Sequence, residues 1–202
     1  MSNLGDQYRC PTGQRGRLVA AMMNRQHEKL TLWGLTKTII GSDFVVLDVG
    51  CGGGKTVSKL AMLAPKGKVF GIDYSAEMVK FSNKIYEVLI AQNRVEIIEG
   101  SVEKMSFKDD FFDLVTAFET YYFWTNLSNA LKEIKRVIKP GGKLLFVNEL
   151  MYGVTPKKVI EETHVRLFSL DEIHNVMQSV GFVGIQVFTK AESPWNAILA
   201  QK

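Results

Sequence analysis

Cysteine, proline and long apolar runs are scarce in this chain of 202 residues, which holds two cysteines and five prolines. Two cysteines cannot build the disulfide framework of a small secreted domain, so we expect reduced thiols and a cytoplasmic protein. No apolar run approaches the roughly 18 residues that a membrane-spanning helix needs, so no membrane span is expected. The first residues hold no apolar stretch between their charges, which argues against a secretory signal.

An excess of charge of one sign is nearly absent too, because 25 basic residues face 21 acidic ones and leave a net charge of +4. Residues 1–40 contain six basic and two acidic residues, so this segment carries the whole excess. A nucleic-acid-binding domain is typically basic along a face or stripe, whereas the rest of this chain is neutral. The distribution favours a small-molecule partner over nucleic acid. It leaves open a tRNA or protein substrate that meets the basic segment.

Short β-branched runs alternate with longer helical patterns, which predicts an α/β fold with a parallel sheet. We expect strands near 44–49, 68–72, 95–98, 112–118 and 143–148, and helices over 56–64, after Ser75, over 127–138 and after Ser169 to 179. Two further strands, near 182–189 and 195–200, should form a hairpin at the end of the sheet. Residues 14–40 have a helical pattern, so we expect a helical cap over 1–40 and one ligand-binding domain over 41–202.

Three details of this prediction can be checked against a structure. Pro140-Gly-Gly142 should form a turn that leads into the fifth strand. In the helix after Ser75, the spacing predicts that Met78, Val79, Ile85 and Leu89 share one buried face. In the cap, Leu18, Met22, Met23, Leu30, Leu32, Trp33 and Leu35 should cover one side.

Glycines are concentrated where the first strand ends, in the segment Val46-Leu-Asp-Val-Gly-Cys-Gly-Gly-Gly-Lys-Thr56. Glycine has no Cβ to block a ligand, and the helix that follows adds free N–H donors. A phosphate-binding P-loop would need glycine at position 49, and a dinucleotide fingerprint would need it at 55 or 57. Those positions hold Val49, Lys55 and Val57, so both motifs fail. What remains is G-x-G-x-G, preceded by Asp48.

This loop resembles motif I of the class I methyltransferases that use S-adenosylmethionine. Asp73, which ends the second strand, matches the family's acidic position there. The segment 100–107, Gly-Ser-Val-Glu-Lys-Met-Ser-Phe, looks like the family's G-D-A-E-x-L-P-F, and 134–146 resembles its helix, Pro-Gly-Gly turn and fifth strand. The resemblance covers about residues 42 to 150 and favours the small-molecule, UbiE-like group. It implies a doubly wound, Rossmann-like sheet of seven strands with an antiparallel last strand.

The resemblance also implies the cofactor, S-adenosyl-L-methionine, and the product, S-adenosyl-L-homocysteine. Asp73 would accept hydrogen bonds from the ribose hydroxyls, and Ser101, which stands where the family usually has an acid, would meet the adenine. The implied cofactor contacts are Asp48, Gly50, Cys51, Gly52, Gly54, Asp73, Tyr74, Met78, Ser101, Val102 and Phe118.

Methyl transfer needs the acceptor atom in line behind the sulfonium methyl, at roughly 3 Å, and a general base only where the acceptor must lose a proton. The candidate base is Glu119, although a carboxylate beside the cofactor ammonium would give the same pattern. Candidate acceptor contacts are Tyr121, Tyr122 and Trp124 after the fourth strand, and His27, Arg15 and Arg17 in the cap. His164 and His174 lack metal-ligand spacing, so no metal is expected.

These observations predict a methyltransferase that moves a methyl group by in-line displacement from S-adenosylmethionine to a small-molecule acceptor. Two alternatives remain at this point. The first is a tRNA or protein methyltransferase that uses the basic cap, and the second is a non-catalytic module that binds the cofactor.

Overall fold

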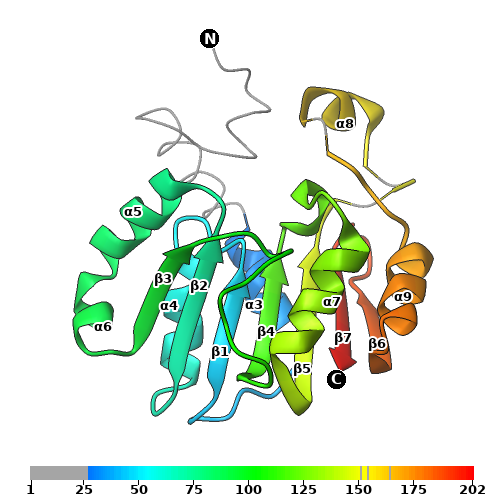
Figure 1. Cartoon of the computed structure of the whole chain (residues 1–202). Helices are drawn as coiled ribbons and strands as arrows, with labels where there is room; N and C mark the ends of the chain where they lie inside the picture. The colour runs from blue at the N-terminus through cyan, green and yellow to red at the C-terminus, as the bar shows by residue number, and fades with distance from the viewer. Residues whose placement is uncertain (1–26, 151, 154, 164) are drawn as a thin grey trace.

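The computed structural model describes residues 27–150, 152–153, 155–163 and 165–202. These residues form a seven-stranded sheet in the order β3-β2-β1-β4-β5-β7-β6, with helices on both faces (Figure 1). The strands are β1 (Val45–Val49), β2 (Lys68–Asp73), β3 (Val95–Glu99), β4 (Phe112–Phe118), β5 (Ile138–Asn148), β6 (Val183–Thr189) and β7 (Asn196–Gln201). β7 runs antiparallel to both of its neighbours, and the pairs β1–β2, β1–β4, β2–β3 and β4–β5 are parallel. The predicted fold class and the closing hairpin are confirmed.

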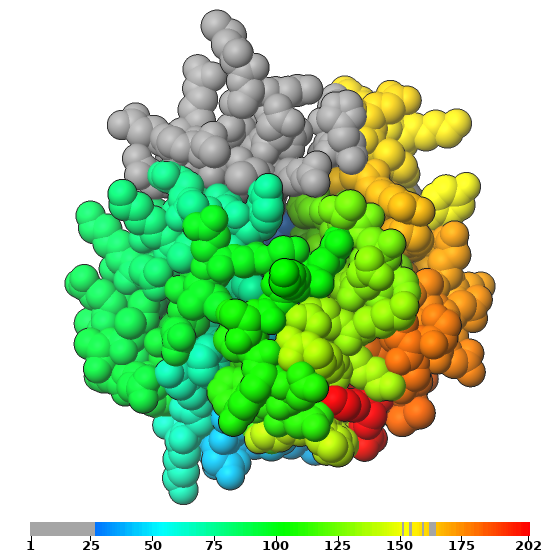
Figure 2. All heavy atoms as spheres, in the orientation of Figure 1, coloured from blue at the N-terminus to red at the C-terminus, as the bar shows by residue number. Residues whose placement is uncertain are grey.

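Helices cover the two faces of the sheet and bury two apolar cores. The helices are α3 (Glu28–Leu35), α4 (Lys55–Leu63), α5 (Ala76–Ile85), α6 (Glu87–Ala91), the short 3-10 helix η1 (Tyr121–Phe123), α7 (Leu127–Val137), α8 (Lys157–Thr163) and α9 (Leu170–Ser179). α3 and α4 pack on one face, and α7 and α9 on the other. In Figure 2 the side chains of α7 and α9 cover much of the right-hand half of the face seen in this view. No helix formed by the described residues is long and apolar enough to cross a membrane.

Local sequence explains where the helices begin. Ser75 precedes α5 and its hydroxyl accepts the N–H of Met78, which satisfies one of the free donors of the first turn. Ser169 precedes α9 and forms a capping box with Glu172, in which each side chain bonds to the backbone of the other. These caps fix the two helices that flank opposite ends of the sheet.

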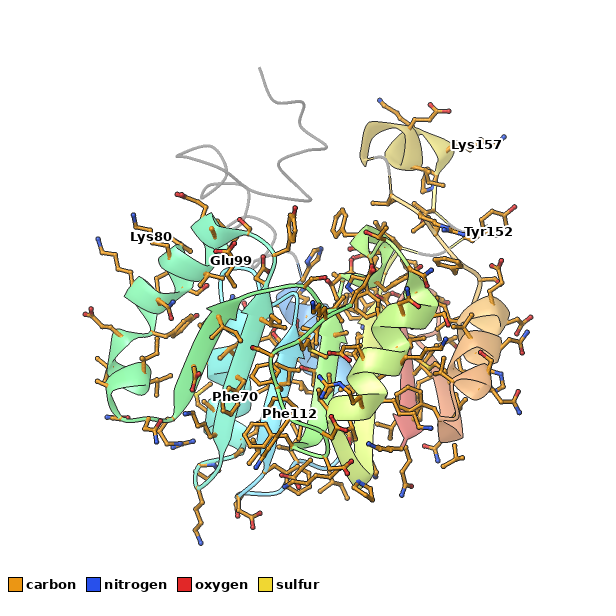
Figure 3. The ribbon with its side chains drawn as sticks, viewed as in Figure 1. Phe70, Lys80, Glu99, Phe112, Tyr152 and Lys157 are labelled. Carbon is orange, nitrogen blue, oxygen red and sulfur yellow. The ribbon has the colours of Figure 1, made fainter. Side chains whose placement is uncertain are left out.

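The register of the sheet brings the ends of three strands together. Val49, the last residue of β1, lies opposite Ile72 on β2 and Ala117 on β4. Because these strands are parallel, the loops that follow them meet at one edge, which is the upper edge in Figure 1. Phe70 and Phe112 pack edge to face in the lower half of the sheet, with ring centroids 5.5 Å apart, well below Glu99 at the upper end of β3 (Figure 3). Since the loops that follow the parallel strands meet at the upper edge, a binding site is expected there.

The structure corrects several details of the sequence prediction. The helix expected after Ser75 is interrupted at Tyr86 and restarts as α6, so Ile85 falls at a helix end and is 50% exposed rather than buried. The expected turn at 140–142 lies inside β5, where Gly141 has a φ of +80° and the pairing with β4 shifts register. The helix α8 was not predicted.

The predicted cap is described only from His27 onward, so most of it lies outside the described residues. Within the described part, the helix ends at Leu35, where Thr36 donates its hydroxyl to the carbonyl of Trp33. Leu30 and Leu35 are buried in the same core as α4, whereas Leu32 is 50% exposed. The segment Thr36–Ile40 is rich in β-branched residues, which disfavour helix continuation. Because Leu30 and Leu35 share a buried core with residues of the strands, α3 packs directly on the sheet.

Candidate functional site

A pocket opens at the upper edge of the sheet, above the ends of β1 and β4. It is lined by residues from the start of α3, the glycine loop after β1, the first turns of α4 and the end of β4. The lining residues are His27, Glu28, Thr31, Asp48, Gly50, Cys51, Gly52, Lys55, Thr56, Lys59, Phe118 and Glu119. The pocket thus brings seven of the predicted site residues together, which are Asp48, Gly50, Cys51, Gly52, Phe118, Glu119 and His27.

The three alternate glycines of the loop have left-handed backbones, with φ of +70° at Gly50, +49° at Gly52 and +76° at Gly54. A Cβ on Gly50 would lie 2.2 Å from the hydroxyl of Thr120, so this glycine is required for the fold itself. A Cβ on Gly52 would meet no atom of the described residues within 4 Å. With respect to these residues, the space beside Gly52 is therefore open, as expected where a ligand approaches the backbone.

The peptide groups of Gly52 are held from two sides. Its N–H donates to Oδ2 of Asp73 at 2.7 Å, and its carbonyl accepts the hydroxyl of Ser82 at 2.7 Å. The other oxygen of Asp73 accepts the N–H of Ser75 at 2.9 Å. Burial raises the pKa of Asp73, and the two backbone hydrogen bonds oppose that rise. Sequence reasoning assigned Asp73 to the ribose and missed both its bond to the loop and the part played by Ser82.

Asp48 lies beneath the loop and is only 2% exposed. Its Oδ1 accepts the hydroxyl of Thr116 on the adjacent strand at 2.6 Å. Burial raises the pKa of Asp48 to about 7, the hydrogen bond from Thr116 opposes this rise, and the charge of Asp73 adds to it. Burial therefore favours the neutral form of this carboxyl well above the pH at which an exposed aspartate ionises. A cation that enters the pocket favours its ionised form.

Glu119 follows β4 directly and has a φ of +55°, a left-handed conformation that non-glycine residues seldom adopt. One carboxylate oxygen accepts the N–H of Glu149, and the other accepts the hydroxyl of Tyr122 at 3.1 Å. His27 Nε2 lies 3.8 Å from the second oxygen. Burial raises the pKa of Glu119 to about 8, and it lowers the pKa of His27. In the structure as it stands, a protonated carboxyl beside a neutral imidazole is the favoured state near pH 7.

The predicted acceptor wall lies mostly in the core. Tyr121 and Tyr122 are 1% and 5% exposed, and their hydroxyls donate to the carbonyl of Leu150 and to Glu119. Trp124 is partly buried, and its indole N–H donates to the hydroxyl of Thr120. Their aromatic character thus serves packing in this structure, and their contact with an acceptor stays a prediction.

The other predicted site residues do not line the pocket. Gly54 caps α4, Met78 is buried, and Val102 lies at the edge of the core. Tyr74 is 73% exposed and Ser101 is exposed, so both can meet a ligand that extends along the edge toward β3. Arg15 and Arg17 lie outside the described residues. Glu149, which sequence analysis did not single out, has no recognisable motif and is found only through the pairing of β4 with β5.

Known proteins match this architecture. The model of the Methyltransferase domain family matches residues 47–146. The chain is 36% identical over 107 residues to a demethylmenaquinone methyltransferase of Lactiplantibacillus plantarum. This alignment covers 52% of this chain and 45% of that protein. It is also 27% identical over 112 residues to a malonyl-[acyl-carrier protein] O-methyltransferase of Priestia megaterium. That alignment covers 55% of this chain and 39% of the relative. The chain thus spans less than half the length of these two relatives.

Among solved structures, the methyltransferase in the complex with the Haloferax volcanii Trm112 methyltransferase activator superposes with a TM-score of 0.82. The alignment covers 100% of this chain and 98% of that one, at 18% identity. At that level of identity, the likeness extends to the fold.

Proposed function

Because the chain belongs to the class I S-adenosylmethionine-dependent methyltransferase family, we propose that it transfers the sulfonium methyl group of this cofactor to a small-molecule acceptor. The observation that carries the proposal is the open space at Gly52, on a glycine loop whose conformation is fixed from both sides. A nucleoside with an amino-acid tail needs such a close backbone approach.

The residues present fit this cofactor. Asp73 keeps a free lone pair on each oxygen after its two backbone bonds, so it can still accept hydrogen bonds from a ribose diol. Asp48 and Glu119, two buried carboxyls on the pocket wall, face the part of the pocket that would receive the cationic end of the cofactor. Negative charge at that point stabilises an ammonium or sulfonium.

The bound cofactor supplies a methyl group that its positive sulfur has already activated. The residues of the chain then have two tasks, which are to hold the two reactants in line and to keep water away from the methyl group. Phe118 provides apolar surface beside the loop. His27 Nε2 lies 3.8 Å from Glu119 on the acceptor side. The neutral imidazole can receive a proton from the acceptor, and Glu119 can do so in its ionised form.

The first experiment is equilibrium binding of S-adenosylhomocysteine, NAD and ATP to the purified chain by isothermal titration calorimetry. We expect one site for S-adenosylhomocysteine and no measurable heat from the other two. Tighter binding of NAD or ATP would refute the proposal. A mass-spectrometric screen of small metabolites with deuterium-labelled methyl donor then identifies the acceptor by a mass gain of one labelled methyl group.

A further inference from the structure

Three side chains that are distant in the sequence meet beside the pocket. His27 precedes α3, Glu119 follows β4 and Glu149 follows β5. β4 and β5 are paired in parallel up to Phe118 and Val147, so the residues that follow them reach the same edge of the sheet. One ligand atom from each of the three side chains lies within 4.8 Å of the other two. We name these three residues the His-Glu-Glu cluster.

The cluster places two carboxyl groups next to each other where burial makes their ionisation costly. Glu119 is only 8% exposed, and Glu149 is half-buried. Among the described residues, no lysine or arginine forms an ion pair with either glutamate; Lys55 and Lys59, which line the same pocket, both bind Glu28 instead. Two carboxylates at this separation repel each other, and burial increases the cost of their charge. A bound cation would remove both penalties.

The donor atoms specify which kind of cation fits. A neutral imidazole nitrogen with two carboxylate oxygens is a ligand set typical of divalent first-row metals and zinc. With metal–ligand bonds of roughly 2.0–2.2 Å, the ligand atoms of one tetrahedral ion lie about 3.3–3.6 Å apart. The ligand atoms of the cluster lie within 4.8 Å of one another, so they would have to approach each other by up to about 1.5 Å to reach this geometry. Such a movement is within the reach of side-chain rotation.

The hydrogen bonds around the cluster favour the same arrangement. The N–H of Glu149 and the hydroxyl of Tyr122 each donate to one oxygen of Glu119, so the carboxylate has a fixed orientation and a free lone pair on each oxygen. Donors of this kind position metal ligands in known sites. A divalent ion would also leave the cluster electrically neutral, so it would not add net positive charge beside a sulfonium.

We propose that the His-Glu-Glu cluster binds one divalent transition-metal or zinc ion, whose open coordination positions hold an oxygen atom of the methyl acceptor. The inference rests on the proposed function, because His27 and Glu119 also line the pocket of the glycine loop. It names the substrate class as an oxygen acceptor, such as a hydroxyl or an enol. The metal lowers the pKa of this hydroxyl, and the proton leaves to solvent. The oxygen lone pair then forms the new O–CH₃ bond, while the electrons of the breaking S–CH₃ bond go to sulfur.

Metal binding can be measured directly on the full chain, without activity. After treatment with EDTA and its removal, the protein is titrated with Mn²⁺ by electron paramagnetic resonance and with Zn²⁺ by calorimetry. We expect one site for at least one of the two ions, with a Kd in the micromolar range or below. Glu149→Gln and His27→Gln should each weaken it at least tenfold. Absence of a site in the wild type would overturn the inference.

The matched control is Glu28→Gln, which removes a carboxylate from the same pocket but not from the cluster. We expect its metal affinity to stay within twofold of wild type. Circular dichroism establishes that each variant is folded, and Glu149→Gln, the less buried of the two glutamates, is the decisive variant. A metal affinity that is unchanged in Glu149→Gln, or equally reduced in Glu28→Gln, would contradict the assignment.

The binding of S-adenosylhomocysteine to the EDTA-treated protein separates this inference from the proposed function. If S-adenosylhomocysteine binds and no metal does, the cluster proposal fails while the methyltransferase proposal stands. If a metal binds but S-adenosylhomocysteine does not, the proposed function fails, and the acceptor role of the metal fails with it. Binding of both supports both.

Discussion

Asp73 at the end of β2 accepts the backbone N–H of Gly52 at 2.7 Å, so the acidic residue of the second strand also fixes the conformation of the glycine loop on the first. The side chain is part of the pocket's architecture before any ligand arrives. Its other oxygen accepts the N–H of Ser75, which ties the loop to the start of α5 as well.

Replacement of Asp73 should therefore weaken cofactor binding through two losses. Asp73→Ala removes the acceptor of the Gly52 N–H and the expected acceptor of the ribose hydroxyls, and hydrogen bonds to a charged group contribute about 1.5–3 kcal/mol each. The loss of one such bond to the ligand predicts that the affinity for S-adenosylhomocysteine falls by at least roughly 10- to 150-fold in calorimetry, and the loss of the Gly52 bond can only add to this. Asp171→Ala, in the exposed first turn of α9, is the control for loss of one carboxylate. Equal affinity in the two variants would remove Asp73 from the site.

Gly52 offers a test that separates ligand binding from folding. Gly52→Val places a side chain in open space, so its cost to the fold is the left-handed backbone, about 1–2 kcal/mol. The same side chain fills the space that the cofactor needs. We expect a folded variant that binds S-adenosylhomocysteine at least 100-fold more weakly than wild type.

The matched control for this variant is Gly184→Val in the edge strand β6. Gly184 has a φ of +57° against +49° for Gly52, and within the described part of the chain a Cβ there also meets no atom within 4 Å. Both variants should lose a similar amount in melting temperature. Only Gly52→Val should lose the ligand, and a retained affinity would mean that the glycine loop does not contact the cofactor.

Ser82 is expected to act on the cofactor through Gly52 rather than by contact. Its hydroxyl is buried and donates to the Gly52 carbonyl at 2.7 Å. Ser82→Ala leaves the loop carbonyl without this donor, so the binding-competent conformation of the loop loses about 1 kcal/mol of stabilisation. We expect a roughly fivefold loss of affinity for S-adenosylhomocysteine, measured by calorimetry, with restoration in part by Ser82→Thr.

Ser58→Ala is the comparison for this prediction, since Ser58 also donates to a backbone carbonyl, that of Lys55 within α4. It should lower the melting temperature without changing the affinity. If the two alanine variants change the affinity equally, Ser82 has no particular role in positioning the loop.

The parts of the fold and of the site that could be predicted from the sequence are those formed by residues close together in the chain. The β1 strand, the loop of Gly50, Gly52 and Gly54, and the helix behind it form one continuous motif, so local pattern was enough to place them. The parallel sheet followed from the alternation of strands and helices, and its seven strands with an antiparallel last strand followed from the resemblance. The role of Ser82 and the meeting of Glu119 with Glu149 could not be predicted in this way, because each depends on contacts between segments about 30 residues apart.

The aromatic segment after β4 shows a different limit. Tyr121 and Tyr122 are aromatic, as residues of a binding wall would be, yet their rings pack in the core against each other, and that of Tyr121 also packs against Phe146. A buried aromatic residue and one that lines a pocket give the same sequence signal, and the direction of η1 decides between them. In the same way, the spacing of Ile85 and Leu89 fits one continuous helix and does not reveal that the helix is interrupted at Tyr86 between α5 and α6.

Asp48 makes the stability of the fold depend on pH in a predictable direction. Its pKa rises from 3.8 to about 7 on folding, because burial disfavours the charged form. The folded state therefore binds the proton more tightly than the unfolded state, so the contribution of Asp48 to stability is present at low pH and is lost as pH rises from about 4 to about 7. At pH 8 the buried charge costs about 4 kcal/mol relative to the neutral form.

Asp48→Asn isolates this effect, because its amide oxygen can still accept the hydroxyl of Thr116 and the side chain stays neutral at every pH. We expect the free energy of unfolding of the variant, measured in urea, to rise relative to wild type between pH 4 and pH 8, since wild type alone must bury a charge above pH 7. Asp171→Asn, which removes an exposed carboxylate of the same type, should follow the wild-type curve across this range. Parallel curves for wild type and Asp48→Asn would contradict the prediction, because they would mean that folding does not raise the pKa of Asp48.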